Sequence, residues 1–453
     1  MASIIKRKQS FAVVYGYTDG EVRKQKWESF PTMAEAKKRK AEVEYKQGVG
    51  SFVVPKCNTL NDLLDEYVSL YGKTKWALST YSSNIAVIDN YIRPRLGNTQ
   101  LSKISTRVIE RYYQELLKTK AVKHEGRFLT PLRVREIHKL LRSCFSQAVK
   151  WEMLEKNPCE NADVPKASYA KREIWTAETI HYALSVCEDE LLALAINLSF
   201  SCSLRMGELL GLTWDCVDIS PESIAAGTPS VHIAKELQRA SRSSMQSLDN
   251  KDIMYVFPAK SSQTTTVLVL KTPKTESSVR TVFLPKTAAE MLACWKNAQE
   301  ERKAMLGSEY MDHNLVFAGP FGAPTEGTSI NAAFDRLIKA HDLPPVVFHS
   351  FRHSSITYKL KLTGGDVKAV QGDSGHAQAK MVSDVYSHIL DDDRKTNAQL
   401  FDEAFYSNGG FQKKPLPTGS ASDNEDQELL LKLVSNPEMA TMIKALAKGL
   451  NMT

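Results

Sequence analysis

The hydrophobic period of this chain changes three times, and each change limits what the chain can fold into. A short segment with strand-like alternation comes first, helical spacing follows over residues 56–166, and mixed patterns fill residues 172–411. Residues 412–453 form a polar tail that ends in an amphipathic helical stripe. At 453 residues the chain also exceeds the size that one hydrophobic core usually serves. We therefore expect a multidomain protein.

Residues 1–50 are expected to form a small β-sheet followed by a helix. Alternation over residues 11–15 predicts a strand, and a Thr-Asp-Gly turn leads into a second strand. Thr32 and Glu35 have the spacing of a capping box, which predicts a helix from there to about Lys46.

Residues 56–166 are expected to be an all-α bundle. Thr59 is predicted to cap a first helix, a second helix to stop at Arg93-Pro94, and a third to follow Ser105. A long fourth helix is predicted over residues 132–153, where apolar residues recur at near-helical spacing.

The stretch NPCENADVPKASYAKRE has two prolines and no apolar period, which predicts a linker. Beyond it, strands are expected in the middle of a largely helical segment, and this favours a mainly helical α+β domain over a wound parallel sheet. Residues 219–265 are expected to be an irregular or strand-bearing excursion. The predicted strands are 231–234, 266–270 and 279–284, and the predicted helices are 177–187, 191–200, 206–212, 288–304, 330–339 and 350–362.

Positive charge is concentrated in the N-terminal part of the chain. Residues 1–50 carry eleven Lys and Arg against six Asp and Glu, and residues 51–170 carry nineteen against twelve. The whole chain has a net charge of +7, so the remainder is negative. This distribution favours a polyanionic partner, most simply nucleic acid, although a basic surface that only keeps the protein soluble explains it equally well.

Two basic surfaces are candidate DNA contacts. Lys24 and Lys26 lie beside Trp27, and a small sheet with these side chains suits a DNA groove, although a module of this size also suits a protein contact. The polar side of the long helix is either a phosphate-contacting surface or an ordinary solvated face. It carries Arg133, Arg135, Lys139 and Arg142.

Several classes of protein are disfavoured. No run approaches the ~20 apolar residues of a membrane span, and the basic start MASIIKRKQS precedes no signal core, so we expect a cytosolic protein without a membrane partner. The seven cysteines are widely spaced and are expected to be buried free thiols. His349 and His353 are four residues apart, but no glutamate completes a His-Glu-x-x-His site, and Arg352 would repel a cation. We expect no metal.

Two arginines stand in contexts that suit a phosphate. Arg205 lies in SCSLRMGELLGLTW at the start of a short predicted helix, and Arg352 lies in FHSFRHSSITYKL one turn after His349. A guanidinium keeps its charge and can bind two phosphate oxygens at once. Either arginine alone is weak support, because most arginines near helix starts are surface charges or ion-pair partners.

The ordered set of sequence boxes is more specific. SLRMGELLGL, PKTESSVRTVFLP, HSFRH, SGH and VYSH follow one another up to residue 388 and resemble the catalytic boxes of the tyrosine recombinase, or phage integrase, family. AVKWEMLEKNPCENADVPK is similar to the end of that family's core-binding domain, and residues 1–50 resemble its arm-binding module. The resemblance implies an arm-binding module at 1–50, a core-binding domain at 56–166, a catalytic domain at 172–411 and a tail at 412–453.

The resemblance also implies how the scissile phosphate is held. Arg205 and Arg352 would bind its oxygens, and His349 and His376 would donate further hydrogen bonds or handle protons. Glu208 resembles the acidic residue that supports this site in the family, and it is placed to orient a cationic neighbour.

The remaining implied roles are those of the nucleophile and the acid. Tyr386 would attack the phosphorus and form a 3′-phosphotyrosyl link, so that neither ATP, metal nor another cofactor is required. Lys274, in the turn of a β-hairpin, would protonate the leaving 5′ oxygen, with Lys271 as a nearby rival. Free tyrosine has a pKa of about 10, and its ionisation at neutral pH costs roughly 4 kcal/mol, which surrounding cations would offset. Without these neighbours Tyr386 would be read as a packing residue.

The chain departs from the family pattern at two places. Cys202-Ser203 stands where the family often has Thr-Gly, and Ser374 replaces the usual apolar residue before Gly-His. Neither change removes a catalytic group.

The favoured function is a site-specific recombinase, the integrase of a phage or conjugative element. A type IB-like topoisomerase and a catalytically silent DNA-binding regulator are the alternatives. The recombinase implies double-stranded DNA with core and arm sites, a homotetramer on DNA, and a place at the nucleoid in the bacterial cytosol. A directionality factor and a host DNA-bending protein are possible further partners. The apolar stripe in residues 412–453 would dock on its own domain or on a neighbouring subunit.

Overall fold

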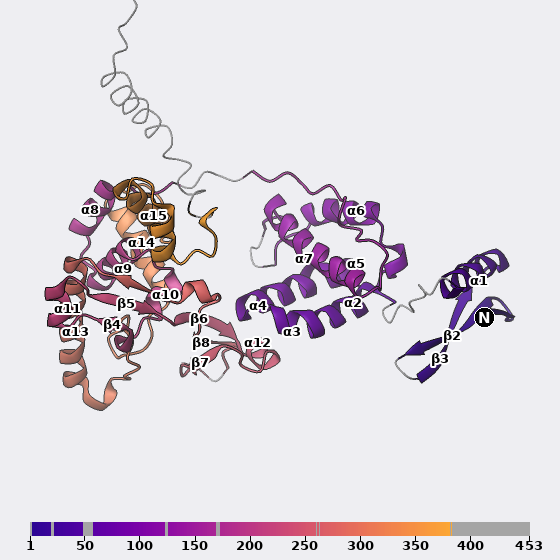
Figure 1. Ribbon diagram of the computed structural model, residues 1–453, viewed down its shortest axis with the longest axis horizontal. Coiled ribbons are helices and arrows are strands. Elements are labelled where there is room, and N and C mark those ends of the chain that lie inside the picture. The colour runs from indigo at the N-terminus through magenta and orange to yellow at the C-terminus, as the bar shows by residue number, and fades with distance from the viewer. Residues whose placement is uncertain are drawn as a thin grey trace, which may run out of the picture. The chain divides into compact units, whose positions relative to one another are not determined.

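The computed structural model describes residues 2–19, 22–48, 58–122, 126–168, 173–259, 261, 263–380 and 382. Within them the chain is largely helical and contains three small three-stranded sheets (Figure 1). Tyr386 and the tail at 412–453 lie outside the described residues.

The N-terminal part is a three-stranded antiparallel sheet with one helix. The sheet order is β1-β2-β3, and the side chain of Thr32 accepts a hydrogen bond from the Glu35 main chain at 3.3 Å, as the capping box predicted. A separate small core joins the sheet to the helix through Val13, Tyr15 and Ala36. Strand β1 was not foreseen. The elements are β1 (Ala2–Lys6), β2 (Phe11–Asp19), β3 (Val22–Phe30) and α1 (Met33–Gly48).

Residues 58–150 are helical throughout apart from their connections. Thr59 caps the first helix in a reciprocal capping box with Asp62, as its sequence position predicted. The elements are α2 (Leu60–Glu66), the π-helical η1 (Tyr67–Gly72), α3 (Lys73–Lys75), α4 (Leu78–Val87), the π-helical η2 (Ile88–Ile92), α5 (Arg93–Leu96), the 3-10 turn η3 (Leu101–Lys103), α6 (Thr106–Leu117) and α7 (Pro131–Lys150).

The predicted helix stop at Arg93-Pro94 is wrong. The helix passes through η2 into α5, and the Arg93 main-chain N–H donates to the carbonyl of Ile88, five residues back. This wider spacing, together with the position of Pro94 at the start of α5, removes the clash and the missing hydrogen bond that a proline causes inside an α-helix.

The part from residue 173 onward is mixed, with most elements near their predicted positions. Two antiparallel sheets have the orders β4-β5-β9 and β6-β8-β7, and the excursion at 219–265 bears strands. The helices are α8 (Ala177–Ser185), α9 (Glu190–Ser201), α10 (Met206–Leu210), α11 (Pro221–Ala226), α12 (Arg242–Ser247), α13 (Lys286–Leu306), α14 (Gly327–Ala340), α15 (Ser350–Leu362) and α16 (Val367–Ser374). The strands are β4 (Val217–Asp218), β5 (Ser230–Ile233), β6 (Glu236–Ser241), β7 (Ile253–Val256), β8 (Thr266–Lys271) and β9 (Arg280–Phe283). The 3-10 turns are η4 (Trp214–Cys216), η5 (Glu276–Ser278) and η6 (Gly307–Glu309).

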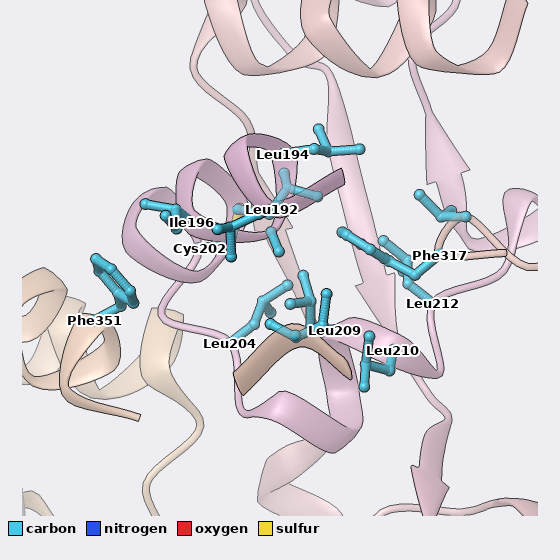
Figure 2. Close-up of a cluster of buried hydrophobic side chains, with 14 of the residues drawn as sticks. Leu192, Leu194, Ile196, Cys202, Leu204, Leu209, Leu210, Leu212, Phe317 and Phe351 are labelled. Atoms are coloured by element: carbon cyan, nitrogen blue, oxygen red, sulfur yellow. The ribbon is translucent and has the colours of Figure 1, made fainter. Parts of the chain in front are cut away.

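An apolar core holds the helices that carry the predicted site residues. Figure 2 shows side chains of α9 and α10 gathered in it, with Phe351 from the start of α15 at its edge. Leu209 and Phe351 are almost completely buried. Burial of each such side chain contributes about 1.5–3 kcal/mol to the free energy of folding. Because Phe351 precedes Arg352 and Leu209 follows Glu208, this core fixes the backbone on which those two polar side chains stand.

Helix α10 also sits directly against a strand. A Cβ on Gly211, just after the helix, would lie 2.6 Å from the main-chain nitrogen of Leu237 in β6. Only glycine fits such an approach, so the SLRMGELLGL segment is held against the sheet.

Six cysteines are described, and all six are free. Cys144, Cys159 and Cys202 are buried as expected, but Cys294 is exposed, so the expectation of buried thiols holds only in part. No helix among the described residues is long and apolar enough to cross a membrane, and these residues contain no cluster of three or more potential metal-ligating His, Cys, Asp or Glu side chains.

Candidate active site

Arg205 is held at the N-terminus of α10 by Glu208 from the same helix. Its Nη1 donates to Glu208 Oε1 at 2.5 Å, and its main-chain N–H donates to Glu208 Oε2 at 3.1 Å. The guanidinium also donates to the carbonyl of Gly375 at 3.4 Å. Glu208 therefore orients this arginine, as the sequence placed it to do.

Arg280 is a third arginine in the site, and it was not singled out from the sequence. It lies on β9, is 8% exposed, and its Nη2 donates to Glu208 Oε2 at 3.1 Å. Its Nε donates to the carbonyl of Asp373 at 2.7 Å. The Glu208 carboxylate thus bridges two guanidiniums. Burial would raise the pKa of Glu208, but the charges of Arg280 and Arg205 outweigh it and hold that pKa below its usual value.

Arg352 is buried on α15, with 2% of its surface exposed. Its two terminal nitrogens donate to the main-chain carbonyls of Ser203 and Ser374, and Nη2 lies 3.1 Å from His376 Nε2. Burial, and next the charge of Arg205, lower its pKa to about 9, so the guanidinium stays charged at neutral pH.

His376 follows a glycine that the local geometry requires. Gly375 ends α16 with φ +62°, and a Cβ there would lie 2.9 Å from the carbonyl of Ser277. His376 is 7% exposed, and burial followed by the charges of Arg352 and Arg205 lowers its pKa to about 4. The imidazole is therefore neutral at physiological pH.

His349 is exposed, unlike the buried Arg352 and His376. It is the exposed residue that precedes α15, one turn before Arg352, and its ring centroid lies 5.2 Å from that of His353.

The structure separates the two candidate lysines. Lys271, at the end of β8, is 3% exposed, and its Nζ binds Glu236 Oε1 at 2.6 Å. Lys274 is exposed and borders a cavity of about 400 Å³ that Arg205, Glu208 and Ser278 also line. The hairpin expected around Lys274 is wrong, because β8 pairs with β6 and β7 whereas β9 pairs with β5. Lys274 lies instead in the connection from β8 to β9, which belong to two different sheets.

The departure at Cys202-Ser203 keeps the backbone shape that a glycine would favour. Ser203 adopts φ +55°, and its hydroxyl lies 2.7 Å from that of Ser355. A non-glycine residue in this region costs about 1–2 kcal/mol. The resulting turn directs the Ser203 carbonyl to Arg352.

The candidate DNA-contact residues differ in their surroundings. Arg135, Lys139 and Arg142 recur at helical spacing on α7, and the last two are exposed. Arg133 is engaged by Glu136 at 2.5 Å, so it is not a free cation of that stripe. Lys24 and Lys26 lie on β3, where Lys26 pairs in register with Tyr15.

The buried group is rich in positive charge. Three guanidiniums, those of Arg205, Arg280 and Arg352, lie around the carboxylate of Glu208. Such an excess favours a bound anion, and forked donors at fixed positions match the tetrahedral oxygens of a phosphate.

Comparisons with known proteins agree with this chemistry. The sequence profile of the phage integrase family matches residues 243–393, and that of the phage integrase N-terminal SAM-like domain matches residues 59–117. The chain belongs to the phage integrase family. It is accordingly a tyrosine site-specific recombinase. The first profile spans the positions of Lys274, Arg352, His376 and Tyr386 but begins after Arg205.

Relatives of this integrase-family chain cover most of its length. The ICEBs1 integrase of Bacillus subtilis is 26% identical over 71% of this chain and 77% of its own length. A XerC-like tyrosine recombinase of Caldanaerobacter subterraneus is 26% identical over 83% of this chain and 90% of its own length. Among solved structures, the Tn1549 transposon integrase in complex with a circular intermediate DNA matches with a TM-score of 0.58 at 18% identity, over 76% of this chain and 100% of that one. That likeness concerns the fold.

Proposed function

We propose that this chain is the integrase of a mobile element, which cuts and rejoins double-stranded DNA through a phosphotyrosyl intermediate at Tyr386. The carrying observation is the gathering of Arg205, Arg352 and His376 around main-chain carbonyls of residues 203, 374 and 375. These groups come from distant parts of the sequence and form one cationic site. Relatives named as the ICEBs1 integrase and the Tn1549 transposon integrase support the mobile-element assignment.

The proposed step is a phosphoryl transfer. The Tyr386 oxygen attacks the phosphorus and forms a new P–O bond, the bond to the 5′ oxygen breaks, and Lys274 gives that oxygen its proton. His349 is the proposed acceptor of the tyrosine proton. Arg205 and Arg352 stabilise the charge on the non-bridging oxygens, which is the main electrostatic demand of this reaction. The reverse step rejoins the strand without ATP or metal.

Replacing Tyr386 by Phe tests this proposal. The wild-type chain should form a covalent protein–DNA adduct on a nicked suicide duplex that carries its site, taken from the DNA flanking its own gene. Tyr386→Phe should form none, because the attacking oxygen is absent while the ring is kept. Denaturing gel electrophoresis of labelled DNA measures the adduct. Tyr358→Phe, at an exposed tyrosine on α15, is the matched control and should react like wild type.

The same assay distinguishes the alternative functions. Absence of an adduct with the wild-type chain would support a DNA-binding regulator, and an equal adduct with Tyr386→Phe would remove the proposed nucleophile. Relaxation of supercoiled DNA without joining of two sites would indicate a topoisomerase. Exchange between two duplexes cuts four strands, so one tyrosine for each strand implies the proposed homotetramer on DNA.

The N-terminal module is proposed to bind separate arm sites. The buried residues of its small core come from β1, β2 and α1, and Phe30 of β3 packs against them. Trp27 on β3 is 49% exposed, with the Arg7 guanidinium 5.2 Å from its ring centroid. An exposed aromatic ring beside cations suits a nucleic-acid surface. Arg135, Lys139 and Arg142 on α7 are proposed contacts to the core site.

Deletion of residues 1–50 should separate these two activities. The truncated chain should lose affinity for distant arm sites, because its basic module is gone, and should still form the Tyr386 adduct on a core site. Mobility-shift assays with arm and core duplexes, each at two salt concentrations, measure the difference. Unchanged arm-site binding would contradict the proposal.

A further inference from the structure

Ser374, which replaces the usual apolar residue before Gly-His, contacts the ring of His376 directly. It is the last residue of α16, it is 0% exposed, and its Oγ lies 2.8 Å from His376 Nδ1. The same hydroxyl donates to the carbonyl of Gln371 at 3.3 Å, and the Gln371 amide donates to the carbonyl of His376 at 2.9 Å. The serine hydroxyl is therefore confined between one ring nitrogen and one carbonyl.

Arg352 determines the direction of these hydrogen bonds. Arg352 Nη2 lies 3.1 Å from His376 Nε2 and 3.5 Å from Nδ1. A guanidinium has no acceptor, so at the shorter of these contacts the ring nitrogen Nε2 accepts. A neutral imidazole carries one proton, which must then be on Nδ1 and must point to Ser374 Oγ. The Ser374 hydroxyl therefore accepts from Nδ1 and donates its own proton to the carbonyl of Gln371. The lowered pKa of His376, about 4, agrees with a neutral ring.

When a phosphate is bound, Nε2 has to donate a hydrogen bond instead of accepting one. The anion offers only acceptors, and an Nε2 lone pair facing it would be repelled, so Nε2 must carry the proton. Nδ1 then needs a donor. A serine hydroxyl supplies one by rotating its proton from the Gln371 carbonyl to Nδ1, whereas an apolar side chain offers neither a donor nor an acceptor.

We propose that Ser374 is a positioning residue that supports both neutral tautomers of His376, with Nε2 accepting from Arg352 in the DNA-free protein and donating to the scissile phosphate in the complex. This inference rests on the proposed function, in which His376 binds that phosphate. The ring keeps one proton in both states, because Nδ1 releases a proton to water as Nε2 takes one up. No other reactant is involved.

Nitrogen-15 spectra of the full chain, labelled at histidine and assigned with His376→Gln, test the first state. In the DNA-free wild type at pH 7.5, Nε2 of His376 should have the shift of an unprotonated nitrogen and Nδ1 that of a protonated one. Ser374→Ala should give a mixture of tautomers, and Ser374→Thr, which keeps the hydroxyl, should restore the wild-type pattern. A protonated Nε2 in the wild type would overturn the inference, and that measurement depends on no Ser374 variant.

The second state is tested with Tyr386→Phe bound to its site duplex, which stays uncleaved. Nε2 of His376 should become protonated there, and an Nε2 that remains unprotonated would refute the proposal. Ser354→Ala is the matched control, because Ser354 is an equally buried serine whose hydroxyl binds the carbonyl of Trp175 instead. Its spectrum at His376 should equal that of the wild type.

Cleavage separates this inference from the proposed function. Ser374→Ala should form the Tyr386 adduct about tenfold more slowly at saturating DNA, which is less than the roughly hundredfold cost of losing a whole oxyanion donor. Ser374→Thr should recover most of the rate. Equal rates for Ser374→Ala and wild type would refute the role of Ser374 while leaving the recombinase intact. No adduct from the wild type would refute the proposed function whatever the spectra show.

Discussion

Replacing Arg352 by Lys is expected to slow formation of the Tyr386 adduct by about a hundredfold to a thousandfold, the usual cost of one lost oxyanion donor. The guanidinium is 2% exposed, and its two terminal nitrogens donate to the carbonyls of Ser203 and Ser374. Those bonds hold a planar fork in one orientation, ready for a phosphate. A lysine ammonium keeps the charge but is a single point, so it cannot satisfy two diverging carbonyls and a phosphate together.

Single-turnover cleavage of the suicide duplex measures this effect, and fluorescence anisotropy measures DNA affinity alongside it. Arg336→Lys is the matched control, because Arg336 is exposed on α14 and should tolerate the change. Affinity should fall much less than the cleavage rate, since many other phosphate contacts bind the DNA. An Arg352→Lys chain that cleaves at the wild-type rate would show that the forked geometry is not used.

Removal of the Glu208 carboxylate should cause the largest loss of stability. Glu208 is 1% exposed and pairs with both Arg205 and Arg280, so Glu208→Ala leaves a buried arginine without its counter-ion. Breaking a buried pair in this way costs about 3–5 kcal/mol. Hydrogen exchange of amides in α9 and α15 reads the free energy of opening in the full chain.

Two further variants sharpen that experiment. Glu326→Ala removes the partner of Arg239 in an exposed pair, 44% and 30% exposed, and should cost about 1 kcal/mol or less. Glu208→Leu combined with Arg280→Met should recover much of the lost stability, because replacing a whole buried pair by apolar residues is often neutral. If Glu208→Ala costs no more than Glu326→Ala, the buried bridge is not structurally important.

The pH dependence has a definite sign. The folded pKa of Glu208 lies below its usual value, so its contribution is complete above the pKa of an unfolded carboxyl and is lost as pH falls through the folded value. Glu208→Gln should therefore flatten the acid side of the stability profile of this part of the chain.

Local signals in the sequence predicted much of the fold. Capping residues at Thr32 and Thr59, and apolar spacing along α7, α9 and α13, report interactions within a few residues of the chain, and these are readable without the tertiary structure. The ordered boxes also indicated Arg205, Arg352 and His376, which the fold brings together. Tyr386 lies outside the described residues, and its role stays a proposal.

Partner choice over long separations was decided only by the tertiary structure. Apolar Val279 and Phe283 suggest one register for β9, yet they are 45% and 65% exposed while Arg280 between them is buried against Glu208. The sequence already disfavoured Lys271 against Lys274, because Lys271 lies inside a predicted strand run. The tertiary structure added that Lys271 is buried and paired with Glu236.

The sequence by itself determined the helical and strand periods, the caps and the order of the reactive groups, because these depend on neighbours along the chain. The tertiary structure decided which cations are paired, that Ser203 adopts a glycine-like turn, and that Ser374 reaches His376. The physical reason is that ion pairing and hydrogen-bond direction depend on burial and on which atoms the fold brings together. Sequence spacing carries no record of these.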